Sequence, residues 1–349
     1  MIQENRQILV NTRILTGHLA GAQRYLLSIL KHMPESLCQV RPRNPMHGIR
    51  GHAWEQFVLP IHLKDKLLWS PSGSGPLMVT KQVLTVHDLV PIDHPEFLNP
   101  HFAAWYQFLL PKLAHRVQRI IAISEFTKQR LINVFNVPEE RICVIWNGVD
   151  ERFCPQPEDR ISSAIKRLGI PTYHYFVALG SLEPRKNLKR LLDAWTHIVE
   201  DLPDDIWLVL AGAKGKSMVF EGVPLDPLPP RVHLTGHVPD ELLPALYAGA
   251  IAAPYLSVYE GFGLPPLEAM ACGTPTFTGN RTALPEVVGN AAMTVDPYDV
   301  EAIAQGLYRL AKDENLRQRL RLDGLKQSSH FSWKNTAEKT WQVLKETAA

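Results

Sequence analysis

The stretch that most directly indicates the fold is YFVALGSLEPRKNLKRLLDAW, residues 175–195. It begins with an apolar β-type run and reaches a glycine at position 180. A short polar loop then leads into a helix-compatible run that starts near Asn187. A buried strand followed by a helix is the repeating unit of parallel α/β sheets. The stretch therefore predicts a strand that ends at Gly180 and a helix from about Asn187.

The same alternation of short apolar runs and longer helix-like stretches continues in both directions along the chain. The other β-type runs are QILV (7–10), QVLTV (82–86), RIIAI (119–123), RICVIW (141–146) and IWLVL (206–210). Such runs indicate strands that are buried on both faces by helices. The segment from Met33 to Gly75 has weak periodicity, and we expect an irregular loop region there.

The chain of 349 residues has the length of about two ordinary domains. A Pro-, Asp- and Gly-rich segment, NGVDERFCPQPED (147–159), reads as a linker, and the alternation restarts after it. We therefore expect a first α/β domain over residues 1–160 and a second over 161–331. A final helical segment, residues 332–349, is predicted from the spacing of Trp333 and Trp341 with neighbouring apolar residues.

Composition excludes several classes of protein. Hydrophobic residues make up 45% of the chain and charged residues 21%, as in globular proteins. The N-terminus has no apolar leader, no run of about 18 apolar residues occurs, and the four cysteines form no C-x-x-C pair. We therefore expect a cytoplasmic protein without a spanning helix, a disulfide framework or a cysteine zinc site.

Charge is unevenly distributed between the two halves. Residues 1–150 carry 16 Lys and Arg against 11 Asp and Glu, whereas residues 151–349 carry 21 against 24. The basic first half suits an acidic membrane surface or a phosphorylated acceptor, and an ordinary solvated surface explains it equally well. This basic density is below that of a nucleic-acid binder, so no nucleic-acid partner is expected.

Two glycine-containing stretches resemble nucleotide-binding motifs, but each lacks a glycine at a position that the motif requires. LVLAGAKGKS (208–217) ends in Gly-Lys-Ser, but Leu210 stands where a phosphate-binding loop needs its first glycine. In SGSGPLM (72–78), Met78 stands where a dinucleotide fingerprint needs its third glycine. The sequence therefore favours neither a P-loop NTPase nor a dinucleotide oxidoreductase.

The most informative stretch for chemistry is SVYEGFGLPPLEAMACGTP, residues 257–275. Two prolines suit the first turn of a helix, and Gly261 and Gly263 form the turn before it. A helix N-terminus behind glycines can bind an anion. Glu260 and Glu268, eight residues apart, are suited to accept hydrogen bonds from sugar and ribose hydroxyls beside a phosphate. An acidic first turn favoured by the helix dipole is the purely structural alternative.

Arg185 and Lys186 follow the strand at 175–179 and are placed to bind a diphosphate. A solvated loop is the alternative for these two cations taken alone. The sequence contains no D-x-D pair, so we expect neither a metal site nor a cofactor. The two cations and the helix N-terminus would instead stabilise a departing diphosphate.

With these motifs in place, the chain resembles the retaining GT-B glycosyltransferases of family four, the group 1 glycosyl transferases, which include many bacterial mannosyltransferases. Further matching stretches in the second half are HLTGHVPDELLPALYAGA (233–250), TALPEVVGNAA (282–292) and FSW (331–333). In the first half they are TVHDLVP (85–91), AISEFTKQRL (122–131) and NGVD (147–150). The resemblance implies a GT-B fold, in which two Rossmann-like domains face each other across a cleft and a last helix returns to the first domain.

The resemblance also implies roles for individual residues. Arg185 and Lys186 would bind the donor diphosphate, Glu260 would face the donor sugar, and Glu268 would hold the ribose. His87 would reach the donor sugar from the first domain, although a single histidine after a strand is more often structural. The remaining implied donor-site residues are Gly180, Gly261, Phe262, Gly263, Leu264, His237 and Val238, and the acceptor-side residues are Gly17 and Gly21.

The implied reaction transfers a hexosyl group with retention of configuration and without a metal. The best candidate is mannosyl transfer from GDP-mannose to a saccharide or lipid-linked saccharide in surface polysaccharide synthesis; UDP-sugars remain alternative donors. A sugar-nucleotide epimerase or phosphorylase and a non-catalytic nucleotide-binding subunit are the rival functions. The helix-like stretch 101–119 would suit the inner membrane face, but we favour a core helix. One departure from the family is Ser181, which replaces an arginine after the glycine, so that Arg185 supplies that charge.

Overall fold

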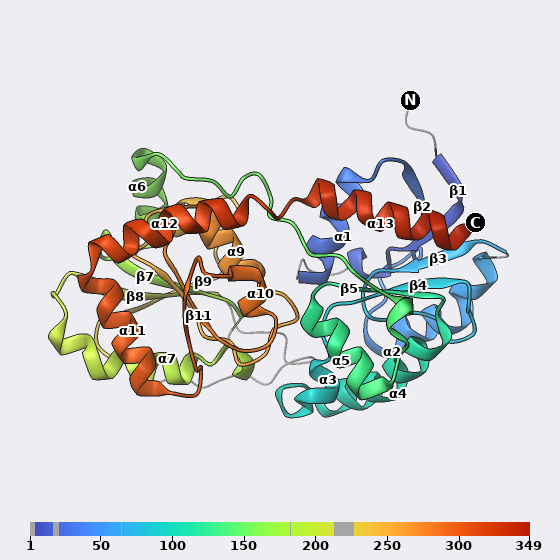
Figure 1. Cartoon of the computed structure of the whole chain (residues 1–349), viewed down its shortest axis with the longest axis horizontal. Coiled ribbons are helices and arrows are strands. Elements are labelled where there is room, and N and C mark those ends of the chain that lie inside the picture. The colour runs from blue at the N-terminus through green and yellow to red at the C-terminus, as the bar shows by residue number, and fades with distance from the viewer. Residues whose placement is uncertain (1–3, 17–20, 64, 182, 213–226) are drawn as a thin grey trace. The chain divides into compact units, whose positions relative to one another are not determined.

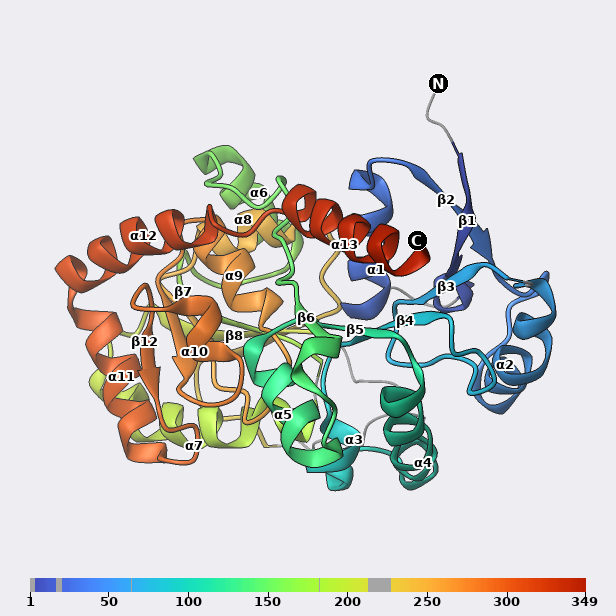
Figure 2. The same ribbon diagram turned by 45° about the vertical axis from the view of Figure 1, so that its right-hand side comes forward.

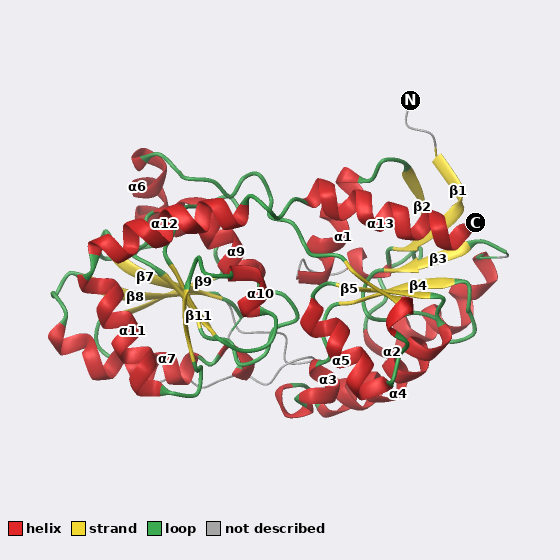
Figure 3. Ribbon diagram, in the orientation of Figure 1, coloured by secondary structure: helices red, strands yellow, loops and turns green. Residues whose placement is uncertain are grey.

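The computed structural model describes residues 4–16, 21–63, 65–181, 183–212 and 227–349 (Figure 1). Gly17 and the Gly-Lys-Ser of residues 215–217 lie outside the described residues. The chain divides into two compact units. The first comprises residues 1–93, 100–148 and 332–349, and the second comprises residues 94–99 and 149–331. In each unit, helices surround a central parallel sheet (Figure 3).

The first unit is built on a six-stranded sheet in the order β2-β1-β3-β4-β5-β6, and every neighbouring pair is parallel. The strands are β1 (Glu4–Asn11), β2 (Ser36–Val40), β3 (Leu67–Ser70), β4 (Gln82–Val86), β5 (Arg119–Ala122) and β6 (Ile142–Val144). Every residue of β3 and β4 is buried, the polar Ser70, Gln82 and Thr85 included, as in strands that are covered on both faces. The predicted strands at 7–10, 82–86, 119–123 and 141–146 are confirmed.

The prediction of an irregular region over residues 33–75 is wrong. This region supplies β2 at the edge of the sheet and β3 between β1 and β4. It also contains a helical run made of α2 (Gly48–Ala53), a π-helical turn (Trp54–Val58) and a 3-10 turn (Leu59–His62). The short apolar runs of β2 and β3 stand among Pro-, Gly- and His-rich residues that mask them, and pairing with β1 decides their conformation.

The helices of the first unit are α1 (Gly21–His32), α3 (Val90–Asp93), α4 (Pro100–Arg116), α5 (Glu125–Phe135) and α13 (Trp333–Ala348). Helix α4 buries Leu109, Leu110 and Leu113 in the core, as the core-helix interpretation of residues 101–119 expected. Helix α13 packs on α1 and contacts β3, with the Trp333 ring 6.0 Å from the ring of Tyr25. The last helix therefore belongs to the first unit.

The second unit contains two three-stranded parallel sheets, β7-β8-β9 and β10-β11-β12. The strands are β7 (His174–Leu179), β8 (Ile206–Ala211), β9 (Val232–Gly236), β10 (Ala253–Tyr255), β11 (Thr276–Gly279) and β12 (Met293–Val295). A parallel bridge between Phe176 and Ala252 joins β7 to the chain that leads into β10. The combined order, β9-β8-β7-β10-β11-β12, is that of a Rossmann fold. The chain adds β8 and β9 on one side of β7 and β10 to β12 on the other, and all neighbouring strands are parallel.

The helices of this unit are α6 (Glu158–Arg167), α7 (Leu188–Ile198), α8 (Leu243–Ala248), α9 (Leu264–Ala271), α10 (Leu284–Val288), α11 (Val300–Lys312) and α12 (Glu314–Ser328) (Figure 2). The helices predicted near Asn187 and at the two prolines correspond to α7 and α9. No helix among the described residues is both long and apolar enough to cross a bilayer.

The division between the units lies between Gly148 and Val149, twelve residues before the predicted boundary at 160. Residues after Gly148 are not a free linker, because the side chain of Phe153 is buried in the core of the second unit. The backbone N–H of Val149 also donates to the carbonyl of Phe331 in that unit. A short stretch at 94–99 also belongs to the second unit, where the His94 ring lies 5.2 Å from that of Tyr259.

Candidate active site

The functional cluster of the second unit lies at the carboxyl ends of β7 and β10. This is the topological switch point of the sheet, where the loops after neighbouring strands diverge and leave room for a ligand. The loop after β7 runs from Gly180 to Asn187, and the loop after β10 runs from Leu256 to Gly263. The backbone carbonyl of Arg185 accepts hydrogen bonds from the N–H of Val258 (2.9 Å) and the hydroxyl of Ser257 (2.8 Å). The two loops are therefore joined at this point.

Glu260 is the centre of the cluster, and its side chain is only 11% exposed. Its Oε1 atom lies within hydrogen-bonding distance of four donors: Lys186 Nζ (2.7 Å), Ser257 Oγ (2.7 Å), Tyr255 OH (2.8 Å) and Arg185 Nη1 (2.9 Å). A buried carboxylate is stable only when it is paired and hydrogen-bonded. These four donors meet that requirement and fix the carboxylate in one position.

Arg185 is held from both sides by carboxylates. Its Nε lies 2.9 Å from Glu183 Oε2, and the Glu183 side chain is only 4% exposed. Its Nη1 binds Glu260 and also donates to the carbonyl of Tyr259 at 3.4 Å. Two cations and two carboxylates thus form one buried network. The predicted phosphate clamp of Arg185 and Lys186 is in this structure charge-balanced by Glu183 and Glu260.

The network determines the protonation of its members. Burial acts to raise the pKa of Glu260, but the charges of Arg185 and Lys186 outweigh burial and lower it to about 2. Burial and the neighbouring Arg185 lower the pKa of Lys186, against the opposing effect of Glu260. Burial and the charge of Glu260 raise the pKa of Tyr255 well above its usual value. At neutral pH, Glu260 is therefore ionised, and Tyr255 is a phenol that donates to it.

Asn187 shapes the loop that carries the two cations. Its backbone is in the left-handed region (φ 59°), a conformation that asparagine adopts more readily than most residues. Its side-chain amide donates to the carbonyls of Leu256 (3.1 Å) and Pro297 (2.6 Å). Asn187 thus ends the loop, precedes α7 and ties the β7 loop to the β10 loop.

The N-terminus of α9 forms the other side of the candidate site. Helix α9 begins at Leu264 directly after Gly263, as predicted from the two prolines. Gly263 has φ 121°, and a Cβ atom there would lie 2.8 Å from the Leu284 side chain, so only glycine fits. Glu268 lies further along this helix and is only 9% exposed. The ring of Phe262 packs edge-on against Phe331 at 5.9 Å, which anchors the turn.

The structure places the other predicted donor residues as follows. The Lys186 side chain passes over Gly180, where a Cβ atom would lie 3.6 Å from its methylene carbons. His237 is exposed after β9, whereas the Val238 side chain is buried in the core of the unit. Only backbone atoms of Val238 are therefore available to a ligand.

His87 belongs to the first unit and follows β4. Its Nε2 lies 2.8 Å from the carbonyl oxygen of Pro71, and its ring packs edge-on against Tyr25 at 4.8 Å. Burial lowers the pKa of His87, so the ring is neutral at neutral pH. Gly21, predicted on the acceptor side, is the first residue of α1. The role of His87 at the donor sugar stays a prediction.

Sequence reasoning gave no role to three members of the cluster: Glu183, Tyr255 and Ser257. Glu183 lies two residues before Arg185 in the stretch already singled out, so an acidic residue beside two cations was an available signal. Tyr255 lies at the end of a buried strand, where its hydroxyl gives no local signal. Its contact with Lys186, 69 residues away, exists only in the folded chain.

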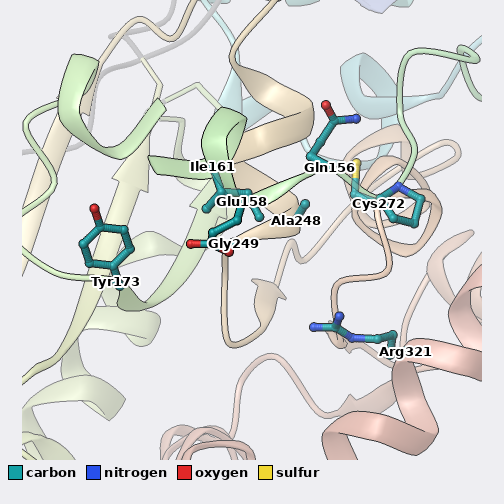
Figure 4. A pocket seen from close by; sticks show the side chains of 9 residues that line it. Gln156, Glu158, Ile161, Tyr173, Ala248, Gly249, Cys272 and Arg321 are labelled. Carbon is teal, nitrogen blue, oxygen red and sulfur yellow. The ribbon is translucent and has the colours of Figure 1, made fainter. Parts of the chain in front are cut away.

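A cavity of about 330 Å³ lies elsewhere in the second unit. Its lining includes Glu158, Tyr173, Cys272 and Arg321 (Figure 4). None of the predicted donor-binding residues lines it. The cavity is therefore separate from the cluster around Glu260.

Comparison with known proteins follows the same division of the chain. Residues 161–327 match the family model "Glycosyl transferases group 1", and residues 61–153 match "Glycosyltransferase Family 4". The O-antigen chain mannosyltransferase B of Escherichia coli is 30% identical over 92% of this chain and 82% of its own. The serotype-specific mannosyltransferase WbdA of E. coli is 32% identical over 74% of this chain, which spans only 32% of WbdA.

Among solved structures, Anabaena HepE, crystallised in complex with UDP and glucose, superposes with a TM-score of 0.75 and 18% identity. The match covers 97% of this chain and 99% of HepE. WaaG, a glycosyltransferase involved in lipopolysaccharide biosynthesis, superposes with a TM-score of 0.69 and 14% identity. At these identities the likeness shows the fold, which is of the GT-B type.

Proposed function

The chain belongs to the group 1 glycosyltransferases, and from that premise we propose that it transfers a mannosyl group from GDP-mannose to a saccharide acceptor in surface polysaccharide synthesis. The relationship to E. coli O-antigen mannosyltransferases supports the sugar and the pathway class. The observation that carries the reaction is the buried Glu260 cluster at the switch point of the second sheet, where two cations and a helix N-terminus converge.

Arg185 and Lys186 are proposed to bind the donor diphosphate. Both already lie within 2.9 Å of Glu260, so a diphosphate would share them with that carboxylate. An added anion would favour the charged form of Lys186, whose pKa burial and Arg185 lower. The two cations, together with the N–H groups of Gly261 to Leu264, would stabilise the negative charge that develops on the leaving diphosphate.

Glu260 and Glu268 are proposed to orient the donor through its hydroxyl groups. Oε1 of Glu260 is occupied by four donors, which holds the carboxylate in place while its other oxygen accepts from a sugar hydroxyl. Glu268, on α9, would accept from the ribose. His237 and the backbone of Val238 would lie at the base, His87 at the donor sugar, and Gly17 and Gly21 on the acceptor side.

We propose that transfer retains the anomeric configuration and needs no metal ion. The acceptor oxygen would form its bond to the anomeric carbon on the face from which the diphosphate departs. The acceptor hydroxyl proton would pass to a diphosphate oxygen, so no side-chain nucleophile is required. The protein would contribute positioning and electrostatic stabilisation of the leaving group.

The deciding experiment incubates the purified protein with a panel of GDP- and UDP-sugars, with and without EDTA. GDP-mannose is expected to be the one donor of the panel from which the nucleotide is released, and EDTA should not change this release. NMR of the mannoside formed on a saccharide acceptor should show the α configuration of the donor. Release that EDTA abolishes, release only from a UDP-sugar, or a β-linked product would each overturn the corresponding part of the proposal. An isomerised nucleotide sugar formed without an acceptor would indicate epimerase activity, and a sugar phosphate formed from added inorganic phosphate would indicate phosphorylase activity.

Two variants test the assignment of the site. Glu260→Gln should abolish transfer while GDP binding is largely kept, because glutamine cannot supply the carboxylate that orients the sugar. Glu314→Gln, on the surface helix α12, removes a carboxylate with an arginine partner outside the cluster and should leave transfer unchanged. Wild-type transfer by Glu260→Gln would show that the active site lies elsewhere.

A further inference from the structure

The helical run of residues 48–62 in the first unit presents an apolar stripe on its outer face. Ile49, Ala53, Phe57 and Ile61 follow one another at intervals of four residues, and all four are exposed. Ile49 is 89% exposed, Phe57 72% and Ile61 74%. Ile49 and Ala53 lie four residues apart on one side of α2, and Phe57 and Ile61 are exposed in the π-helical and 3-10 turns that follow. A solvent-facing side is normally polar, so this stripe is unusual, whereas scattered exposed apolar residues are common.

The opposite face of the same run is firmly anchored. Trp54, Leu59 and Leu63 are buried in a cluster with residues of β1 and β3. Glu55 is completely buried, with its Oε1 2.6 Å from Asn11 Nδ2 and 3.4 Å from Arg13 Nε. The buried face therefore fixes the orientation of the run. The apolar stripe cannot turn inward without breaking this packing.

Another exposed apolar side chain, outside the run, follows a loop that is bonded to it. Gln56 donates to the carbonyl of Gly75 (2.8 Å) and accepts from the N–H of Leu77 (3.0 Å). These two hydrogen bonds hold the loop after β3 against the run, immediately before Met78. Met78 is 76% exposed. The loop thus adds a fourth large apolar group, and together these make a surface of Ile49, Phe57, Ile61 and Met78.

The segment that carries this surface has more exposed cations than exposed anions. Arg41, Arg43 and Arg50 are all exposed. Over residues 41–66 the acidic residues are Glu55, whose side chain is 0% exposed, and Asp65, which is exposed, so three exposed arginines stand against one exposed carboxylate. The exposed part of this segment is therefore cationic and apolar. Figure 2 shows α2 at the periphery of the first unit.

We propose that this surface binds an anionic lipid bilayer, with Phe57, Ile61, Ile49 and Met78 in the interfacial layer and the three arginines on lipid phosphates. Large apolar side chains beside arginines are the composition with which helices lie on anionic membranes. Charge complementarity favours lipid over a second copy of this chain, because a symmetric contact would bring the arginines of both copies together. The proposal concerns a face of the first unit and does not depend on the donor or the acceptor.

The test measures binding of the full chain to phosphatidylglycerol–phosphatidylethanolamine vesicles and to phosphatidylcholine vesicles by flotation. Binding to the anionic vesicles that weakens with added salt is expected, with little binding to the neutral ones. Phe57→Ser combined with Ile61→Ser should lower the vesicle partition coefficient at least about tenfold, because both side chains lose their place in the interface. Arg43→Gln combined with Arg50→Gln should lower binding to the anionic vesicles and leave binding to the neutral vesicles unchanged.

The matched control is Leu322→Ser on α12 of the second unit, since Leu322 is 68% exposed and lies outside the proposed surface. It should bind vesicles as the wild type does. Urea unfolding shows whether each variant remains folded; Phe57 and Ile61 are exposed, so their replacement should not lower stability. The proposal would be overturned if the wild type did not bind anionic vesicles, or if the Phe57/Ile61 variant bound them as well as the wild type. It would also be overturned if Leu322→Ser lost as much binding as the Phe57/Ile61 variant. A wild-type dimer in sedimentation that Phe57→Ser abolishes would assign the surface to self-association instead.

Discussion

Replacing Glu260 with glutamine also tests whether the buried ionic network stabilises the second unit. Arg185 and Lys186 outweigh burial and lower the pKa of Glu260 from 4.5 to about 2. Each tenfold change in proton affinity corresponds to about 1.4 kcal/mol. The ionised carboxylate therefore contributes about 3 kcal/mol to the free energy of unfolding at neutral pH. Glutamine has nearly the shape of protonated glutamic acid, so Glu260→Gln should lose about this amount.

The loss should depend on pH in a defined direction. A carboxylate whose pKa is lower in the folded than in the unfolded state stabilises the protein above its unfolded pKa. That stability disappears as the pH falls through the folded pKa. The gap between wild type and Glu260→Gln should therefore be constant above about pH 5, fall to about half near pH 3, and vanish below about pH 2.

Urea unfolding followed by tryptophan fluorescence, at about pH 7 and again near pH 3, measures this gap. The control is Glu314→Gln, because Glu314 also pairs with an arginine but is 61% exposed. An exposed pair contributes about 0–1 kcal/mol, so the control should change little at either pH. A gap below about 1 kcal/mol at neutral pH would refute the energetic role of the pairing. A gap that is the same at both pH values would assign the loss to packing instead of charge.

Three further predictions concern separate parts of the molecule. Lys186→Ala should weaken GDP binding by calorimetry about 10- to 100-fold, the value of a charge-assisted hydrogen bond; unchanged affinity would remove Lys186 from the donor site. Gly212→Ala should lower the free energy of unfolding by more than about 2 kcal/mol, because a Cβ atom there would overlap the carbonyl oxygen of Gly180. A Cβ atom at Gly21 meets nothing within 4 Å, so Gly21→Ala is the control; equal stability of both variants would contradict the clash. NMR titration of His87 should give a pKa below 6.5, since burial disfavours the charged ring; a midpoint at or above 6.5 would contradict this.

Much of the second unit was predictable because its signals are local. A buried strand ending in glycine, a cationic loop and a helix from Asn187 follow one another within about twenty residues. The start of α9 was predictable for the same reason, since two prolines in a first turn and a glycine before it restrict the backbone of those residues alone. These features do not depend on which other segment lies nearby.

Residues 33–75 show where local patterns fail. The apolar runs of β2 and β3 are short and stand among Pro-, Gly- and His-rich residues, and pairing with β1 makes them strands. The division after Gly148 lies before the predicted boundary at 160, because Phe153 looks like part of a polar linker until its burial in the second core is known. Burial of one side chain by residues distant in sequence leaves no trace in its own neighbourhood.

The sequence by itself determined a parallel α/β fold, the glycine–proline start of α9, and the residue types suited to bind a sugar nucleotide. Only the tertiary structure decided that Lys186 and Glu260, 74 residues apart, form one buried cluster with Glu183, Arg185 and Tyr255. The physical reason is the distance along the chain over which each effect acts. Backbone preferences and hydrophobic periods act over a few residues, whereas the pKa of a buried carboxylate depends on which charges folding brings within about 3–4 Å of it.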